Sequence, residues 1–169
     1  MAGLILTDRE RIDLMLPGMI FRRIIAALIR EGEKDGVEAD KHPLMPALRL
    51  FDLAAAQAVD GLPADKVEKL TRRCWRVAGR AVKPLEERPL ATAMVAATAM
   101  LRQALDEGVL ETDPEGPFMR AFTIVAATSD QDPRDADVLA TVRRSGEKAG
   151  RRMLEQLRQE GALLAPKAA

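Results

Sequence analysis

The hydrophobic positions of this chain recur with the period of an α-helix. Apolar residues return every three or four positions, and Gly and Pro separate the periodic segments. Alanine is abundant and tyrosine is absent, which favours helices over strands. The pattern predicts helices over residues 8–16, 19–30, 44–59, 64–83, 90–105, 117–128 and 133–160, and therefore an all-α, single-domain bundle of five to seven helices.

Local signals set the expected ends of these helices. Thr7 and Glu10 have the spacing of a capping box. Pro17 and Gly18 are expected to break or kink the chain after the first helix, and Gly32 to stop the second. Residues 31–42 are charged and aperiodic, so we expect a mobile surface loop there, and residues 163–169 should form a frayed tail.

The segment 90–105 is Ala-rich and apolar around its whole circumference until Arg102. A helix of this kind is usually covered on all sides, so we expect it at the centre of the bundle. The last helix carries Gly146 and Gly150 on its apolar stripe. Each glycine weakens a helix by about 1 kcal/mol relative to alanine, so the pair is expected to mark a close crossing of two helices.

The helix over residues 64–83 has the most one-signed surface in the sequence. Its apolar residues fall on one side, and seven cations fall in an arc of roughly 120° on the other. We assign these cations as a partner-binding face: Lys66, Lys69, Arg72, Arg73, Arg76, Arg80 and Lys83. The alternatives are a nucleic-acid surface, and a solvated face neutralised by Glu86, Glu87 or the acidic residues of the 31–40 segment.

Cys74 and Trp75 lie on or beside the apolar side of this helix. We expect a buried, structural cysteine, because adjacent helical residues point about 100° apart and Arg73 need not approach the sulfur. Trp75 is expected to cap the edge of the core. Its alternative role is that of an exposed interface aromatic.

Length and charge narrow the class of protein. A chain of 169 residues can bury a core as one domain, residues 1–169. Lys plus Arg equals Asp plus Glu at 26 each, so any steering of a charged partner depends on local patches. One cysteine permits no internal disulfide. With no cationic leader and no uncharged stretch long enough to span a bilayer, we expect a cytoplasmic protein without membrane contact.

Catalytic residue types are scarce. The chain has two serines and one histidine, and His42 has no second histidine or cysteine pair to complete a zinc site. The acidic run over residues 130–137 lacks the glycine, spacing and final glutamate of a calcium loop, and helix capping explains it. We therefore expect no metal and no cofactor. An enzyme that works through carboxylates and arginines is an alternative, although the scarcity of catalytic residue types argues against it.

The helices that begin at Met19, Pro89 and Pro117 are each apolar over more than one face. A domain of this size cannot easily bury three such helices, so the remaining apolar surface is expected to serve self-association or a partner helix. The alternative is a compact bundle that buries them through broad interhelical contacts. The leading interpretation is a non-catalytic interaction protein, a regulator or assembly factor that forms homo-oligomers. The alternatives are a nucleic-acid-binding regulator and a ligand-binding bundle with an apolar pocket between helices.

Overall fold

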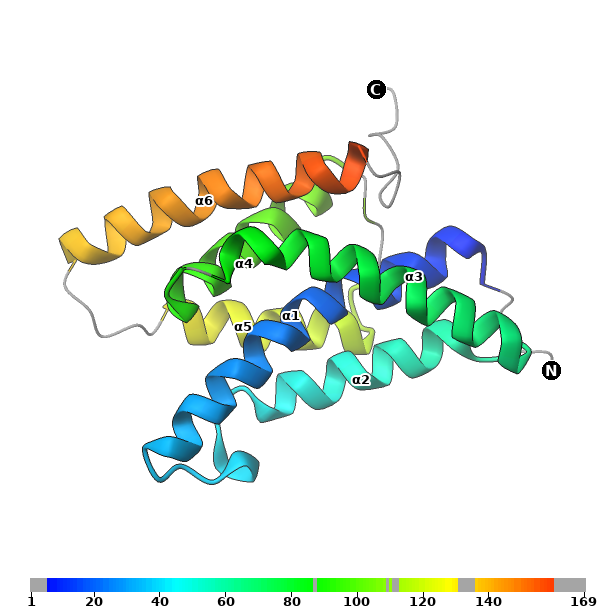
Figure 1. Ribbon diagram of the computed structural model, residues 1–169, viewed down its shortest axis with the longest axis horizontal. Coiled ribbons are helices and arrows are strands. Elements are labelled where there is room, and N and C mark those ends of the chain that lie inside the picture. The colour runs from blue at the N-terminus through cyan, green and yellow to red at the C-terminus, as the bar shows by residue number, and fades with distance from the viewer. Residues whose placement is uncertain (1–5, 87, 109, 111–112, 131–135, 160–169) are drawn as a thin grey trace.

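The computed structural model describes residues 6–86, 88–108, 110, 113–130 and 136–159 (Figure 1). These residues form six α-helices and two 3₁₀ turns, and no strand occurs among them. The all-α helical bundle is therefore confirmed. The elements are α1 (Asp8–Lys34), η1 (Ala39–Lys41), α2 (Met45–Val59), α3 (Ala64–Val82), η2 (Lys83–Leu85), α4 (Leu90–Asp106), α5 (Pro117–Asp130) and α6 (Ala136–Gln159).

Helix α1 is continuous through Pro17 and Gly32, so the two separate helices expected over residues 8–16 and 19–30 are one helix, and the expected stop at Gly32 is wrong. Proline costs a helix interior about 3 kcal/mol, but apolar residues of α1 are buried on both sides of Pro17. At Gly18 the helix lies close to α2, because a Cβ atom there would be 3.3 Å from Cδ1 of Phe51. Burial along the whole of α1 outweighs the local cost of the proline.

The predicted charged loop over residues 31–42 is consequently shorter than expected. Its first four residues complete α1, and Ala39–Lys41 form η1. The connection reverses at Gly36, whose φ of +87° is readily adopted only by glycine. The predicted tail over residues 163–169 lies outside the described residues, whereas the capping box at Thr7 and Glu10 is confirmed by both of its hydrogen bonds.

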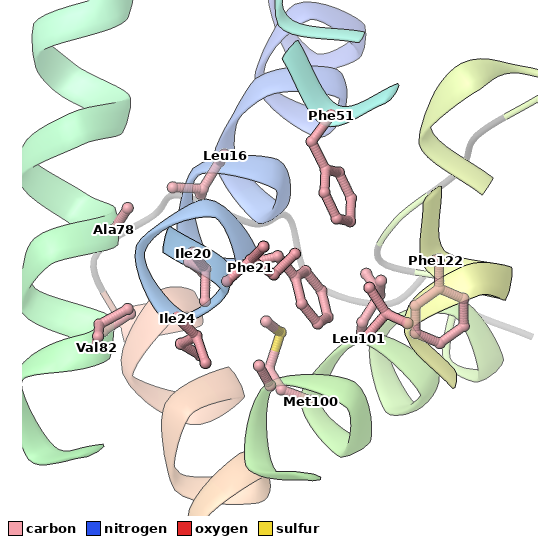
Figure 2. Packing of buried hydrophobic residues seen from close by; sticks show 14 of the residues in the cluster. Leu16, Ile20, Phe21, Ile24, Phe51, Ala78, Val82, Met100, Leu101 and Phe122 are labelled. Carbon is pink, nitrogen blue, oxygen red and sulfur yellow. The ribbon is translucent and has the colours of Figure 1, made fainter. Parts of the chain in front are cut away.

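Helix α1 lies inside the bundle, where it packs against α2, α3 and α4. The rings of Phe21 and Phe51 stack with centroids 5.3 Å apart, and Phe122 meets Phe21 edge-on. Figure 2 shows this cluster extending to Met100 and Leu101 of α4. The N-terminal helix and the middle of the chain thus share one core.

Helix α4 is also central, as predicted. No residue of α4 is exposed from Leu90 to Leu101, and the helix contacts α1, α5 and α6. Helix α6 lies along α4 at the close crossing that its glycines predicted (Figure 1). A Cβ atom on Gly146 would lie 2.5 Å from Cγ1 of Val95, and one on Gly150 would lie 2.5 Å from the carbonyl oxygen of Ala96.

The expected surplus of apolar surface is wrong for the described residues. Helices α1, α4 and α5 together bury most of their large apolar side chains, because the three helices pack on one another. The large hydrophobic residues that stay exposed lie on four separate segments: Val37, Leu53, Trp75 and Val138. In the part of the chain that the structure describes, no helix is long and apolar enough to cross a membrane.

Candidate functional site

Helix α3 holds the candidate surface. Pro63 precedes its first residue and Pro84 follows its last turn, so proline marks both ends. Its inner face is buried against the core, mainly beside α1, through Cys74, Val77, Ala78, Ala81 and Val82. The opposite face is therefore held rigidly toward solvent.

All seven predicted cations are exposed: Lys66, Lys69, Arg72, Arg73, Arg76, Arg80 and Lys83. We call this set the basic face. Arg72 pairs with Glu68 one turn earlier on the same helix. The members that form no ion pair with any described residue are Lys66, Lys69, Arg73, Arg76 and Lys83.

The described residues that were expected to neutralise the basic face form no ion pair with it. In the acidic segment, Glu38 pairs with Lys41 and Asp40 pairs with Arg49. Glu86 forms no ion pair with a described residue, and Glu87 is not among the described residues. Among the described residues, none of the expected counter-charges pairs with the basic face, and five of its seven cations form no ion pair.

Trp75 is not a core residue, so the expectation that it caps the core is wrong. Its side chain is 49% exposed, and the guanidinium carbon of Arg23 lies 4.0 Å from the centre of the ring. Trp75 stays exposed because α1 places the charged side chain of Arg23, and not an apolar one, at this edge of α3. The guanidinium also lies across Gly79, where a Cβ atom would be 3.2 Å from Nη2 of Arg23.

Sequence reasoning missed the position of Arg23 over Trp75. Two signals could have found it. Arg22 and Arg23 interrupt an otherwise uncharged stretch between Leu14 and Ile29, and Trp75 and Gly79 are four residues apart on α3, which places them on one edge. A tryptophan beside a glycine on one helix edge leaves space for a long cation from the next helix.

Cys74 is the buried structural residue that the sequence predicted. Its exposed fraction is 2%. Burial raises the pKa of the thiol to about 11, and the nearby positive charge of Arg73 opposes this only in part. The sulfur is therefore protonated at neutral pH and is not a nucleophile.

Comparison of the chain with protein-family models, curated proteins and solved structures found no match.

The basic face continues beyond α3 at its C-terminal end. A hollow of about 460 Å³ is bordered by Arg80, Lys83, Pro84 and Gln156. A neighbouring hollow of about 260 Å³ adds Arg88 and Arg152. Helices α3 and α6 meet here, and the side-chain amide of Gln156 donates to the carbonyl oxygen of Arg80 at 3.4 Å. Folding thus gathers cations that the sequence separates by more than 60 residues.

The other candidates have ordinary structural roles or are not described. The Nδ1 atom of His42 accepts a hydrogen bond from the backbone N–H of Leu44 at 3.1 Å. Among the described residues, no group of three or more His, Cys, Asp or Glu could hold a metal ion. The capping roles expected for Asp132 and Asp135 lie outside the described residues. Between α4 and α5 there is an apolar hollow of only about 200 Å³.

Proposed function

We propose that this chain is a non-catalytic binding protein whose basic face docks on an acidic surface of a protein partner. One observation carries the proposal: the cations of α3 are exposed, and most of them form no ion pair with a described residue. Surface charges that are already paired contribute little to a new interaction, whereas unpaired charges can form pairs across an interface.

The dimensions of the face fit a macromolecular partner. From Lys66 to Lys83 the helix rises about 25 Å at 1.5 Å per residue, a length comparable with one side of a protein interface. Because the inner face is buried, the charges are held along one line rather than on a mobile loop. Such a line accelerates encounter with an acidic surface, and added salt weakens the effect.

Two features favour a protein over a nucleic acid. The chain has no net charge, whereas a nucleic-acid-binding domain usually carries a basic excess. The half-exposed Trp75 also stands at the edge of the basic face beside Arg23, and tryptophan and arginine are the residue types that most often dominate protein–protein binding energy.

The test compares two triple variants in the cells that make the protein. Lys69→Gln, Arg73→Gln and Arg76→Gln remove three unpaired cations of the basic face. Arg102→Gln, Arg120→Gln and Arg144→Gln remove three exposed arginines elsewhere and form the matched control. Tagged proteins are purified with and without nuclease treatment, and the co-purifying proteins are identified. The purified partner is then titrated at two salt concentrations.

We expect a protein partner that survives nuclease treatment, binds the control triple normally and binds the basic-face triple at least about tenfold more weakly. The difference should shrink at high salt. An association that nuclease abolishes would replace this proposal with the nucleic-acid alternative. Equal binding by both triples would reject the basic face as the docking surface.

Self-association and a cytoplasmic location stay predictions. The exposed large hydrophobic residues among those described lie on separate segments, so the burial pattern by itself does not favour a dimer. Light scattering at micromolar concentration measures the oligomeric state directly. A clean monomer would reject self-association without affecting the proposed role of the basic face.

A further inference from the structure

A cavity of about 650 Å³ opens between α1, α3, η2 and the start of α4. Its floor is apolar and is formed by Ile24, Val82, Leu85 and Ala93, all of which are buried. Figure 2 shows Ile24 and Val82 on facing sides of α1 and α3. The volume lies within the range of about 300–1,000 Å³ that is typical of small-molecule sites.

The charged side chains around this cavity are mainly cationic. Arg22, Arg23 and Arg30 of α1 line it, and Glu86 is the acidic residue among the lining side chains. Arg22 is already engaged, because its Nη1 lies 3.4 Å from a carboxylate oxygen of Asp52. Arg30 forms no ion pair with a described residue. The cavity therefore offers positive charge above an apolar floor.

Arg23 has hydrogen-bonding capacity that the described residues do not use. Its Nε atom is buried and has no hydrogen-bond partner, and its other nitrogens donate to no described residue. The side chain is held instead by the Trp75 ring and by the space that Gly79 leaves. A guanidinium has five N–H donors in a planar fork that matches carboxylate and phosphate groups. The buried Nε lies out of reach of a ligand, but the two terminal nitrogens donate to no described residue and keep four N–H donors for an anion in the cavity.

We propose that this cavity binds a small amphipathic anion, with a carboxylate or phosphate head and an acyl-type apolar body. Arg23 and Arg30 bind the head group, and the body lies on the aliphatic floor beside Trp75. The small side chains of Ala26 and Ala27 on the α1 wall leave room for a chain of methylene groups. None of the seven cations of the basic face lines this cavity, and the two proposed sites share only Trp75 and Arg23 at their common edge.

The fluorescence of Trp75 can be used to measure ligand binding in this cavity. It is the only tryptophan and the chain has no tyrosine, so the intrinsic emission reports on the wall of this cavity. The full chain is titrated with decanoate, decyl phosphate and decanol, all below the concentrations at which micelles form. Decanol is the matched neutral probe, and comparison of the two anions identifies the preferred head group.

We expect a saturable change in emission with at least one of the anions, with an affinity at least about tenfold higher than that for decanol. Equal affinity for decanol and both anions, or no saturable binding, would overturn the proposal. Both results are independent of the protein-partner experiment, which alters other residues.

Substitutions of the residues that line the cavity test whether the ligand binds there. Calorimetry replaces fluorescence here, because a change at Arg23 alters the surroundings of Trp75 directly. Arg23→Gln and Arg30→Gln should each weaken binding of the anion by about tenfold or more and leave decanol unchanged. Ala27→Phe should fill the cavity and weaken binding of every probe. Arg120→Gln, an exposed arginine of α5, is the matched control.

Circular dichroism confirms that each variant is folded before it is titrated. The three cavity variants are Arg23→Gln, Arg30→Gln and Ala27→Phe. If they bind the anion as strongly as the control Arg120→Gln, the ligand binds elsewhere and the proposal is overturned.

Discussion

Glycine permits two different kinds of contact in this bundle. Between α4 and α6, Gly150 lies against the backbone of α4, and Gly146 lies against the side chain of Val95 and the backbone nitrogen of Ala96. Between α1 and α3, Gly79 admits the guanidinium of Arg23, and a cavity lies alongside. The first contact leaves no space for a ligand. The second leaves both space and unused hydrogen-bond donors.

The two contacts are therefore expected to have different roles: the α4–α6 contact in stability and the α1–α3 contact in binding. A backbone contact contributes close packing but offers no group to a partner, since its polar atoms already bond within helices. A side chain that stacks on a ring keeps most of its donors available. We therefore expect substitutions at the α4–α6 contact to change stability, and substitutions at the α1–α3 contact to change binding.

The strongest test of this separation is Gly150→Ala. The new Cβ atom would lie 2.5 Å from the carbonyl oxygen of Ala96 and 2.9 Å from the backbone nitrogen of Met100. Neither backbone atom can move without shifting a helix, so we expect the free energy of unfolding to fall by about 3 kcal/mol. Chemical denaturation measures this. A stability equal to or above that of the parent would show that the crossing is loose.

The second test concerns the closed inner face of α3. Because the pKa of Cys74 is about 11, compared with an ordinary value of 9.0, its thiolate fraction at pH 8 is about 100-fold lower in the folded chain than in the unfolded chain. Alkylation by iodoacetamide should slow by at least that factor relative to the chain in denaturant. Fast alkylation of the folded chain would mean that α3 opens on the edge where Trp75 lies.

The same shift predicts a pH dependence. The unfolded thiol loses its proton at lower pH than the folded thiol, so the unfolded state gains stability as the pH rises. The contribution of Cys74 is fully present below pH 9 and is lost as the pH rises through about 11. Denaturation of the parent and of Cys74→Ala at pH 8 and pH 10.5 should show a smaller decrease in the variant.

A third test extends the comparison to arginines of the same helix. Arg11 is buried, and its Nη1 donates to the carbonyl oxygens of Ala58 and Asp60 at 2.9 and 3.0 Å, where α2 ends. Arg11→Gln should lower the free energy of unfolding by about 2 kcal/mol, because a charged donor is lost and two carbonyl groups lose a partner. Arg23→Gln should cost less than about 1 kcal/mol. Equal losses would contradict the assignment of Arg23 to binding.

The smallest expected effect is that of Gly79→Ala, the matched partner of Gly150→Ala. Its Cβ atom would meet the flexible end of Arg23 at 3.2 Å, which can move aside. The stability should change by less than about 1 kcal/mol, because alanine favours the helix. The emission of Trp75 should nevertheless change as the guanidinium is displaced. A large loss of stability would mean that Arg23 has a structural role.

The periodicity of the chain predicted most of the fold. It located the central helix, the glycine crossing and the buried Cys74, because each follows from which face of a helix is apolar. It failed at Pro17 and Gly32, where tertiary burial outweighs local helix-breaking preferences. It also failed at Trp75, because the environment of that ring depends on Arg23, which lies more than 50 residues away and on another helix.

Helix α1 also determines how the chain folds during synthesis. Its apolar face is complete when Lys34 has been made, but α4, which covers part of it, ends at Asp106. At about 5–20 residues per second, a ribosome needs about 4–14 seconds to add the intervening residues. During that interval the isoleucines and Phe21 of α1 have no permanent partner from α4. Helices α2 and α3 are made before α4 and cover part of α1, so the nascent chain exposes the part of its apolar face that waits for α4.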